Sequence, residues 1–181
     1  MRFASGLLAL QCVLGIGVTE SLAQGTDWRL TLHGAGRVRV GMTIDEASRA
    51  ADGEVYDAAK TWECDTWMPA EANQGVPGVP VFSIRDGMVA YATILFPEAR
   101  TWRGARVGLT ETAVQRLYGH RLESIPSPRG HLGHRWLIYV PLTPADSAYR
   151  MVFETDGHRV TSIMAGAWPF AFELEGCSTA Q

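Results

Sequence analysis

The sequence predicts an α+β fold made of two related units, each a short helix packed on a small antiparallel sheet. The first observation behind this prediction is an internal similarity, because residues 40–47 (VGMTIDEA) align with residues 107–114 (VGLTETAV). The second is a pair of Asp-Gly turns, at residues 86–87 and 156–157, each between two apolar runs. An Asp-Gly pair in that setting is the strongest short-range signal for a β-hairpin. A helix followed by a hairpin is therefore expected twice along the chain.

Both aligned segments are typical of a helix start. Thr43 and Glu46 match a capping box, in which the Thr hydroxyl accepts a backbone N–H and the Glu carboxylate reaches back to the cap. Thr110 caps the second helix without that partner, because Ala113 stands at the position equivalent to Glu46. Helices are expected over residues 44–51 and 111–118, each ending near a glycine. Each would have one apolar stripe that needs a sheet to cover it.

Alternating apolar residues and turn residues predict the strands. These are expected at residues 28–32, 62–68, 81–84, 88–94, 135–140, 149–154 and 158–163. Residues 69–80 and 125–134 are rich in Pro and Gly and are predicted to be irregular connections. Domains of about 75 residues are marginal in core burial, so the two units, 24–100 and 101–181, are expected to be fused into one domain.

The first 23 residues match a cleavable signal peptide. Arg2 supplies the positive charge, residues 6–18 form a short apolar run broken by Gln11, and small residues lead up to Ala23. The run is shorter than the roughly 20 apolar residues that cross a bilayer, so no membrane span is expected after cleavage. A lipid anchor at Cys12 is the other alternative, and the bulky Gln11 before it argues against that. A periplasmic or secreted location follows.

The composition of the chain excludes one class of partner and predicts one disulfide. The net charge is −3 and there is no run of Lys or Arg, so no nucleic-acid partner is expected. Of three cysteines, Cys64 and Cys177 would remain after cleavage of the leader. In an oxidising compartment we expect them to form a disulfide, with two buried thiols as the alternative.

Motifs for catalysis are missing from the sequence. It contains no Gly-x-Ser-x-Gly elbow, no phosphate loop and no complete dinucleotide fingerprint. A cysteine nucleophile is excluded if the two cysteines are bridged. We therefore predict a protein that is not an enzyme, has no cofactor and acts by binding.

A metal site formed by His120, His131 and His134 is the alternative. Imidazoles three residues apart can bind zinc, but structural sites normally need four ligands and catalytic sites need three and a water. Pro and Gly residues around His131 and His134 favour a solvated loop instead. The alternative function is a small metal-binding protein or a metal-dependent enzyme.

The tryptophans suggest where a partner would bind, because Trp and Arg are enriched at binding hot spots. Trp62, Trp136 and Trp168 are expected to fill the core between the helices and the sheet. Trp67 lies beside the Pro-rich connection and is predicted to be exposed. Together with Met68 and Asn73 it forms the predicted partner contact.

The segment at residues 41–43, its repeat at 108–110 and the helix-then-hairpin order resemble the tandem-repeat β-lactamase inhibitor protein family. They are also similar to the small outer-membrane assembly lipoproteins, which hold a single copy. Closer similarity is to uncharacterised exported bacterial proteins that share residues 39–43, the hairpin at 153–157 and the ending at 173–178. The resemblance implies a non-catalytic scaffold whose sheet surface meets an unknown protein partner in the cell envelope. Inhibition of a β-lactamase is not carried over, because one cysteine per half predicts a bridge between halves, whereas the inhibitors place a disulfide within each repeat.

Overall fold

The computed structural model describes residues 27–51, 55–60, 65–73, 75–129 and 131–169. The fold is mixed α+β and is dominated by antiparallel sheets. The predicted leader (1–23), Cys64, Cys177 and Trp62 lie outside the described residues. None of the helices in the described ranges is long and apolar enough to cross a bilayer.

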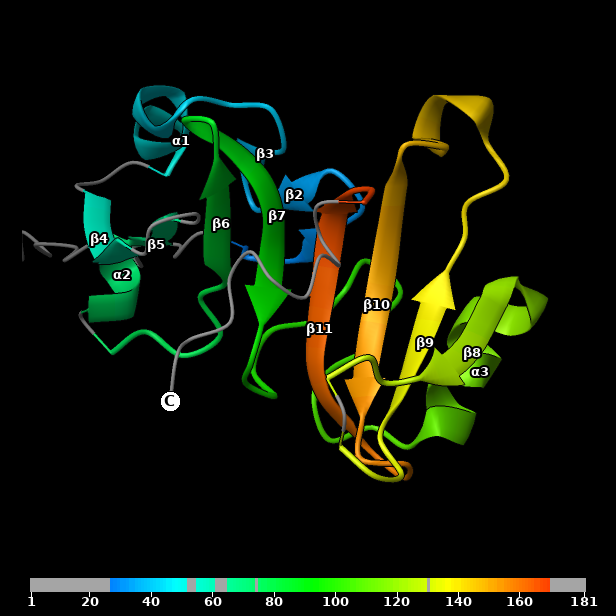
Figure 1. Cartoon of the computed structure of the whole chain (residues 1–181). Coiled ribbons are helices and arrows are strands. Elements are labelled where there is room, and N and C mark those ends of the chain that lie inside the picture. The colour runs from blue at the N-terminus through cyan, green and yellow to red at the C-terminus, as the bar shows by residue number, and fades with distance from the viewer. Residues whose placement is uncertain (1–26, 52–54, 61–64, 74, 130, 170–181) are drawn as a thin grey trace, which may run out of the picture.

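The larger sheet has eight strands in the order β4-β5-β6-β7-β11-β10-β9-β8, which run from left to right in Figure 1. Their bounds are β4 Val55–Lys60, β5 Asp65–Pro69, β6 Val81–Arg85, β7 Met88–Ile94, β8 Leu122–Pro126, β9 Arg135–Tyr139, β10 Tyr149–Thr155 and β11 Val160–Ala167. The smaller sheet consists of β1 Leu30–Thr31, β2 Gly34–Ala35 and β3 Val38–Arg39. The helices are α1 Ile44–Ala50, α2 Ala70–Asn73 and α3 Glu111–Tyr118, with 3-10 turns η1 Gly119–Arg121 and η2 Pro144–Asp146.

The predicted helices and hairpins are confirmed. α3 has the predicted bounds and α1 ends one residue early, while β6–β7 and β10–β11 form the two expected hairpins. The predicted strand at 28–32 is shorter and belongs to the small sheet. The edge strands β4 and β8 were not predicted, and neither was α2, which lies within the segment expected to be irregular. Four of the five residues of β8 are exposed, so this strand lacks the alternation of buried apolar residues that identifies a strand in the sequence.

Equivalent backbone hydrogen bonds join the segments before α1 and α3 to the large sheet. The Gly41 N–H donates to the carbonyl of Val89 in β7, and the Gly108 N–H donates to that of Val160 in β11, both over 2.8 Å. These glycines have φ values of 88° and 86°, a region that side chains disfavour. Each helix therefore begins beside the strand that closes its own hairpin.

The two helix caps differ as the sequence predicts. The Thr43 hydroxyl accepts from the Glu46 N–H at 3.3 Å, and the Glu46 carboxylate accepts from the Thr43 N–H at 2.9 Å. These hydrogen bonds from Thr43, the backbone one first, hold the pKa of Glu46 below its ordinary value. The Thr110 hydroxyl accepts from the Ala113 N–H at 3.2 Å.

Replacing either cap residue with Ala is expected to lower the free energy of unfolding by about 0.5 to 2 kcal/mol. Thr43→Ala should cost more, because the Thr43 hydroxyl also contacts the Glu46 carboxylate at 3.0 Å. Urea denaturation measures both losses, with Thr112→Ala on the exposed surface of α3 as the control. Equal losses at all three positions would contradict the capping argument.

The large sheet has two different faces. One face, here called the covered face, packs against α1, α3 and the small sheet through a large cluster that includes Ala47, Val114 and Phe153. Successive strand residues point to opposite faces, so Val152 lies on the other one, here called the open face. A smaller cluster on the open face contains Trp136, Ile138, Val152 and Met164.

Candidate functional site

Trp67 is buried, so the prediction that it makes an exposed partner contact is wrong. It lies in β5 opposite Phe82 of β6, with the ring centroids 5.1 Å apart, and is only 2% exposed. The strand register directs Trp67 to the covered face, whereas the prediction considered only its closeness in sequence to the Pro-rich connection. Met68 is half-buried. Asn73 is the last residue of α2, and its side chain lies outside the described part of the chain.

The two other described tryptophans that were predicted to fill the core have different outcomes. Trp136 is buried as predicted, at 3% exposure, but it belongs to the cluster on the open face. Trp168 is 44% exposed, so its predicted core position is wrong. It directly follows the last residue of β11, and the Arg150 guanidinium lies 5.5 Å from its ring centroid.

The three histidines of the alternative metal site are not gathered. His131 and His134 lie in the connection between β8 and β9 with ring centroids 5.0 Å apart, whereas His120 lies in η1. Within the described ranges, no three His, Cys, Asp or Glu side chains are placed to hold a metal ion. The three-ligand arrangement that the alternative required is therefore not formed by these residues.

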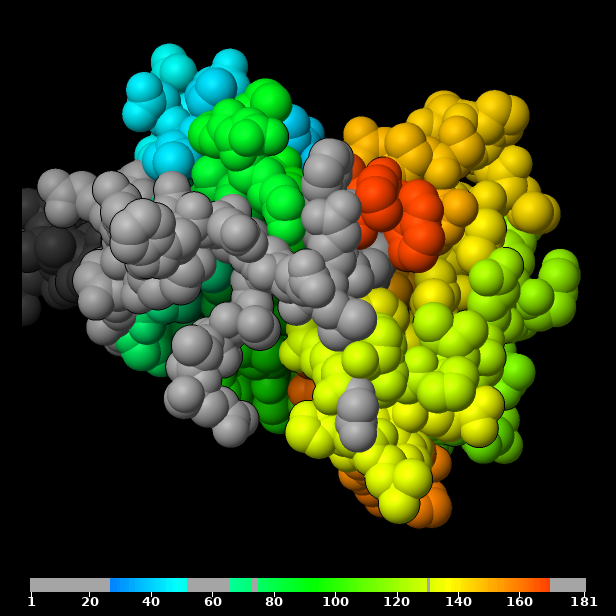
Figure 2. Space-filling view, in the orientation of Figure 1, coloured from blue at the N-terminus to red at the C-terminus, as the bar shows by residue number. Residues whose placement is uncertain are grey.

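The open face has a hollow of about 370 Å³ near the middle of the large sheet, here called the central hollow. Strands β5, β6, β7, β10 and β11 contribute to it, so it spans the pairing of β7 with β11. Six of its lining residues carry hydroxyls: Thr66, Ser83, Tyr91, Thr93, Thr161 and Ser162. The others are Val81, Leu95, Arg129, Glu154 and Met164. In Figure 2 a small orange area of β11 marks this place, between the green of β7 and the yellow-green connection after β8.

Glu154 is the buried charged residue that lines this hollow. It lies in β10 and is 6% exposed, opposite Ser162 of β11. Its carboxylate accepts from the Ser162 hydroxyl at 3.2 Å and from the Ser127 hydroxyl at 3.4 Å, and the Arg129 guanidinium lies 3.5 Å away. Burying a carboxylate is costly unless it is paired and hydrogen-bonded. These contacts therefore hold the β8–β9 connection, which carries Ser127 and Arg129, over the open face.

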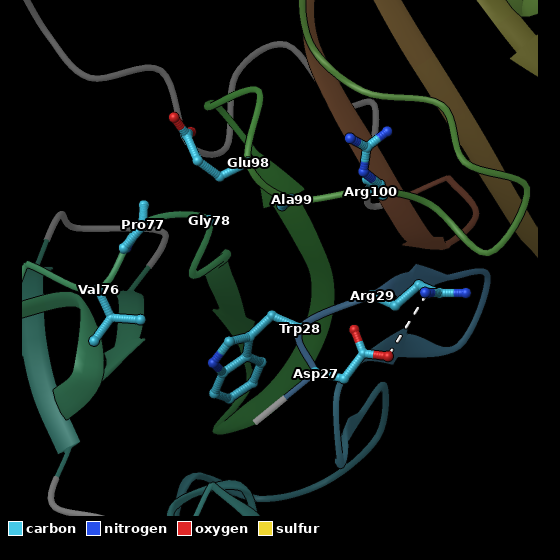
Figure 3. Close-up of a pocket in the computed structure, with 9 residues that line it drawn as sticks. All are labelled: Asp27, Trp28, Arg29, Val76, Pro77, Gly78, Glu98, Ala99 and Arg100. Carbon is cyan, nitrogen blue, oxygen red and sulfur yellow. Dashed lines mark ion pairs between the residues drawn. The ribbon is translucent and has the colours of Figure 1, made fainter. Parts of the chain in front are cut away.

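A second hollow, of about 220 Å³, lies between residues 27–29, 76–78 and 98–100 (Figure 3). Asp27 and Arg29 form an ion pair at 3.7 Å, but their side chains are 77% and 55% exposed, and such pairs contribute little. The Trp28 indole N–H already donates to the Glu71 carboxylate at 2.5 Å. In Figure 3, Glu98 points away from the Trp28 ring. The central hollow is the stronger candidate because its charged carboxylate is buried.

Three exposed apolar side chains lie at one end of the large sheet. Leu95 and Phe96 follow β7 and are 48% and 58% exposed, and Leu132, between β8 and β9, is fully exposed. The antiparallel strand order brings the end of β7 and the start of β9 to the same end of the sheet, the lower one in Figure 1. We call these three residues the apolar edge. Leu95 also lines the central hollow, so the two features are continuous.

The sequence signal for the hollow is a set of polar residues at alternate strand positions. Ser83 in β6, Tyr91 and Thr93 in β7, and Ser162 in β11 occupy strand positions whose side chains point to the open face. Polar residues at every second strand position are ordinarily interpreted as a solvated face. Only the strand order shows that they line the same hollow as a buried carboxylate.

Comparisons with known proteins do not assign the chain to a family. No family model matches it, and no curated protein matches it. Among solved structures it is similar to the uncharacterised protein YfeY from Escherichia coli, with a TM-score of 0.47 and 11% identity. That likeness covers 76% of this chain and 99% of the other. A TM-score this low supports no argument about function.

Proposed function

We propose that the protein is an exported, non-catalytic binding protein whose open face meets a protein partner in the cell envelope. The observation that carries the proposal is the apolar edge, Leu95, Phe96 and Leu132, which is exposed beside a hollow that holds a buried carboxylate. Export is inferred from the leader-like sequence of residues 1–23. The disulfide between Cys64 and Cys177 is part of the same proposal, because export would place both in an oxidising compartment.

Two related units, 24–100 and 101–181, are the architecture we propose for this scaffold. Each of α1 and α3 follows a Gly-x-Thr segment and is followed by four strands of the large sheet. The matching Gly41 and Gly108 contacts support the same interpretation. The pairing of β7 with β11 would join the units, so that a partner on the open face would contact both.

The exposure of the apolar edge favours a protein-binding role for this surface. Large side chains exposed together mark interaction sites, and the buried centre of an interface is apolar with a polar rim. Leu95 and Leu132 would supply the apolar centre. Arg129, in the same connection as Leu132, would supply part of the rim. Strands hold the ends of these segments in place, so the surface would be preorganised.

Photo-crosslinking tests this proposal. A crosslinking amino acid at Leu95 or at Leu132 is expected to trap the same envelope protein in living cells. Leu142 is the matched control, because it is 67% exposed but lies beyond the opposite end of β9. Leu95→Glu and Leu132→Glu should each weaken capture at least about tenfold, the effect of about 1.4 kcal/mol, whereas Leu142→Glu should not. Equal trapping at all three positions, or none at Leu95 and Leu132, would refute the proposed surface.

A further inference from the structure

The Glu154 carboxylate has unused hydrogen-bonding capacity. An ionised carboxylate can accept about four hydrogen bonds, and contacts to charged groups are usually about 2.5 to 2.9 Å long. The three contacts of Glu154 measure 3.2, 3.4 and 3.5 Å, so none is a short one. The carboxylate is nevertheless 6% exposed and lines the hollow. A donor entering the hollow would therefore complete a set of contacts that the protein alone leaves loose.

The charge of the hollow selects against ions. Arg129 and Glu154 are its only charged lining residues among those described, and they lie 3.5 Å apart with opposite charge. A cation attracted to Glu154 would meet Arg129, and an anion attracted to Arg129 would meet Glu154. A neutral ligand avoids both repulsions and leaves the ion pair intact.

The other lining residues define the polarity of that ligand. Each Ser, Thr or Tyr hydroxyl both donates and accepts, and six such side chains line the hollow. They therefore suit a ligand whose own groups also donate and accept hydrogen bonds, such as an alcohol with several hydroxyls. Val81, Leu95 and Met164 add apolar surface to the lining of the same hollow. A pyranose ring presents this combination, with hydroxyls around its edge and C–H groups on its faces.

Size is consistent with this chemistry. Small-molecule sites usually measure about 300 to 1,000 Å³. The hollow, at about 370 Å³, lies at the lower end of that range. It is therefore suited to one hydrated sugar ring, or to one unit at the end of a longer glycan.

We infer that the central hollow is a binding site for a neutral saccharide unit. The Glu154 carboxylate accepts from two neighbouring sugar hydroxyls. The hydroxyls of Thr93 and Ser162 bond to the others, and Met164 and Leu95 contact the ring face. This site does not depend on the protein partner proposed above.

Titration of the full-length mature protein with methyl glycosides tests the inference. Methyl glucoside, methyl galactoside and methyl N-acetylglucosaminide are followed by protein NMR, with alanine as a zwitterion, choline as a cation and acetate as an anion. At least one glycoside is expected to bind saturably, with a dissociation constant in the millimolar range. Saturation by an ion or the zwitterion, without saturation by any glycoside, would overturn the assigned ligand class. The absence of saturable binding by every probe would overturn the site.

Variants locate the binding within the molecule. Glu154→Gln and Thr93→Val keep the side-chain shapes and are each expected to weaken glycoside binding at least about tenfold, a change of about 1.4 kcal/mol. Thr112→Val, exposed on α3, should leave it unchanged. Thermal unfolding checks that each variant is folded, and Thr161→Val serves as a second hollow variant if one is not. Equal affinity in the hollow variants and in Thr112→Val would overturn the assignment. Crosslinking at Leu95 and Leu132 is a separate measurement. If it traps no partner, the glycoside titration still tests the saccharide site.

Discussion

A Tyr118→Ala variant is expected to lose about 3 to 5 kcal/mol of unfolding free energy, the range for truncating a large buried aromatic side chain. Tyr118 is the last residue of α3 and is 2% exposed. Its ring centroid lies 5.1 Å from that of Tyr139 in β9 and 4.9 Å from that of Phe153 in β10. Removing the ring would leave a cavity between α3 and the large sheet, which well-packed neighbours fill only in part.

The Tyr118 hydroxyl predicts a separate effect at high pH. It donates to the Thr101 hydroxyl at 2.7 Å, and burial raises its pKa, although that hydrogen bond and the Arg103 charge oppose the rise. The unfolded chain releases this proton near its ordinary pKa of about 10, before the folded protein does. Stability is therefore unaffected by this group below about pH 10 and falls as the pH rises further, by up to about 1.4 kcal/mol per pH unit.

Urea denaturation at neutral pH and at several pH values above 10 measures both effects. Tyr118→Phe keeps the ring, so it should lose only about 0.5 to 1.5 kcal/mol at neutral pH, the contribution of one hydrogen bond. Its alkaline loss of stability should also be smaller than that of the wild type. A loss in Tyr118→Ala no greater than in Tyr118→Phe would contradict the packing role of the ring.

Gly166→Ala is expected to cost at least about 3 kcal/mol, the upper end of the usual range for overpacking. Gly166 lies in β11 opposite Tyr91 of β7, at the pairing that joins the two groups of four strands. A Cβ on Gly166 would overlap the carbonyl oxygen of Ala90 and the Cβ of Tyr91, and would stand 2.5 Å from the Tyr91 Cα. Backbone atoms of a paired strand cannot move aside as a flexible side chain can, so β7 and β11 would have to separate.

Ala167→Val is the control for this variant. It adds apolar bulk at the next residue of β11, which is only half-buried, and is expected to change stability by no more than about 0.5 kcal/mol. Denaturant unfolding of the two variants gives the comparison. Crosslinking at Leu95 in Gly166→Ala should also fall, because the open face crosses the disturbed pairing. A stability loss in Gly166→Ala as small as in Ala167→Val would show that the two strands can separate locally at little cost.

Only part of the candidate site was predictable from the sequence. The connection that carries Ser127 and Arg129 was recognised as irregular, and the strands that carry Glu154 and Ser162 were predicted. Their assembly was not, because Ser127 and Glu154 are 27 residues apart in the chain. Such contacts depend on which strands are neighbours, and the period of a strand does not contain that information.

The sequence by itself determined the local features. The capping box of Thr43 and Glu46, the bounds of α3 and the two Asp-Gly hairpins all depend on residues within a few positions of one another, where backbone hydrogen bonds and side-chain period decide the outcome. The tertiary structure alone decided which face each strand presents to the core. It buried Trp67 against Phe82, left Trp168 exposed and brought hydroxyls from four strands into the hollow that Glu154 lines. The physical reason is that strand register is set by pairing between distant segments, and a shift of one residue exchanges the two faces.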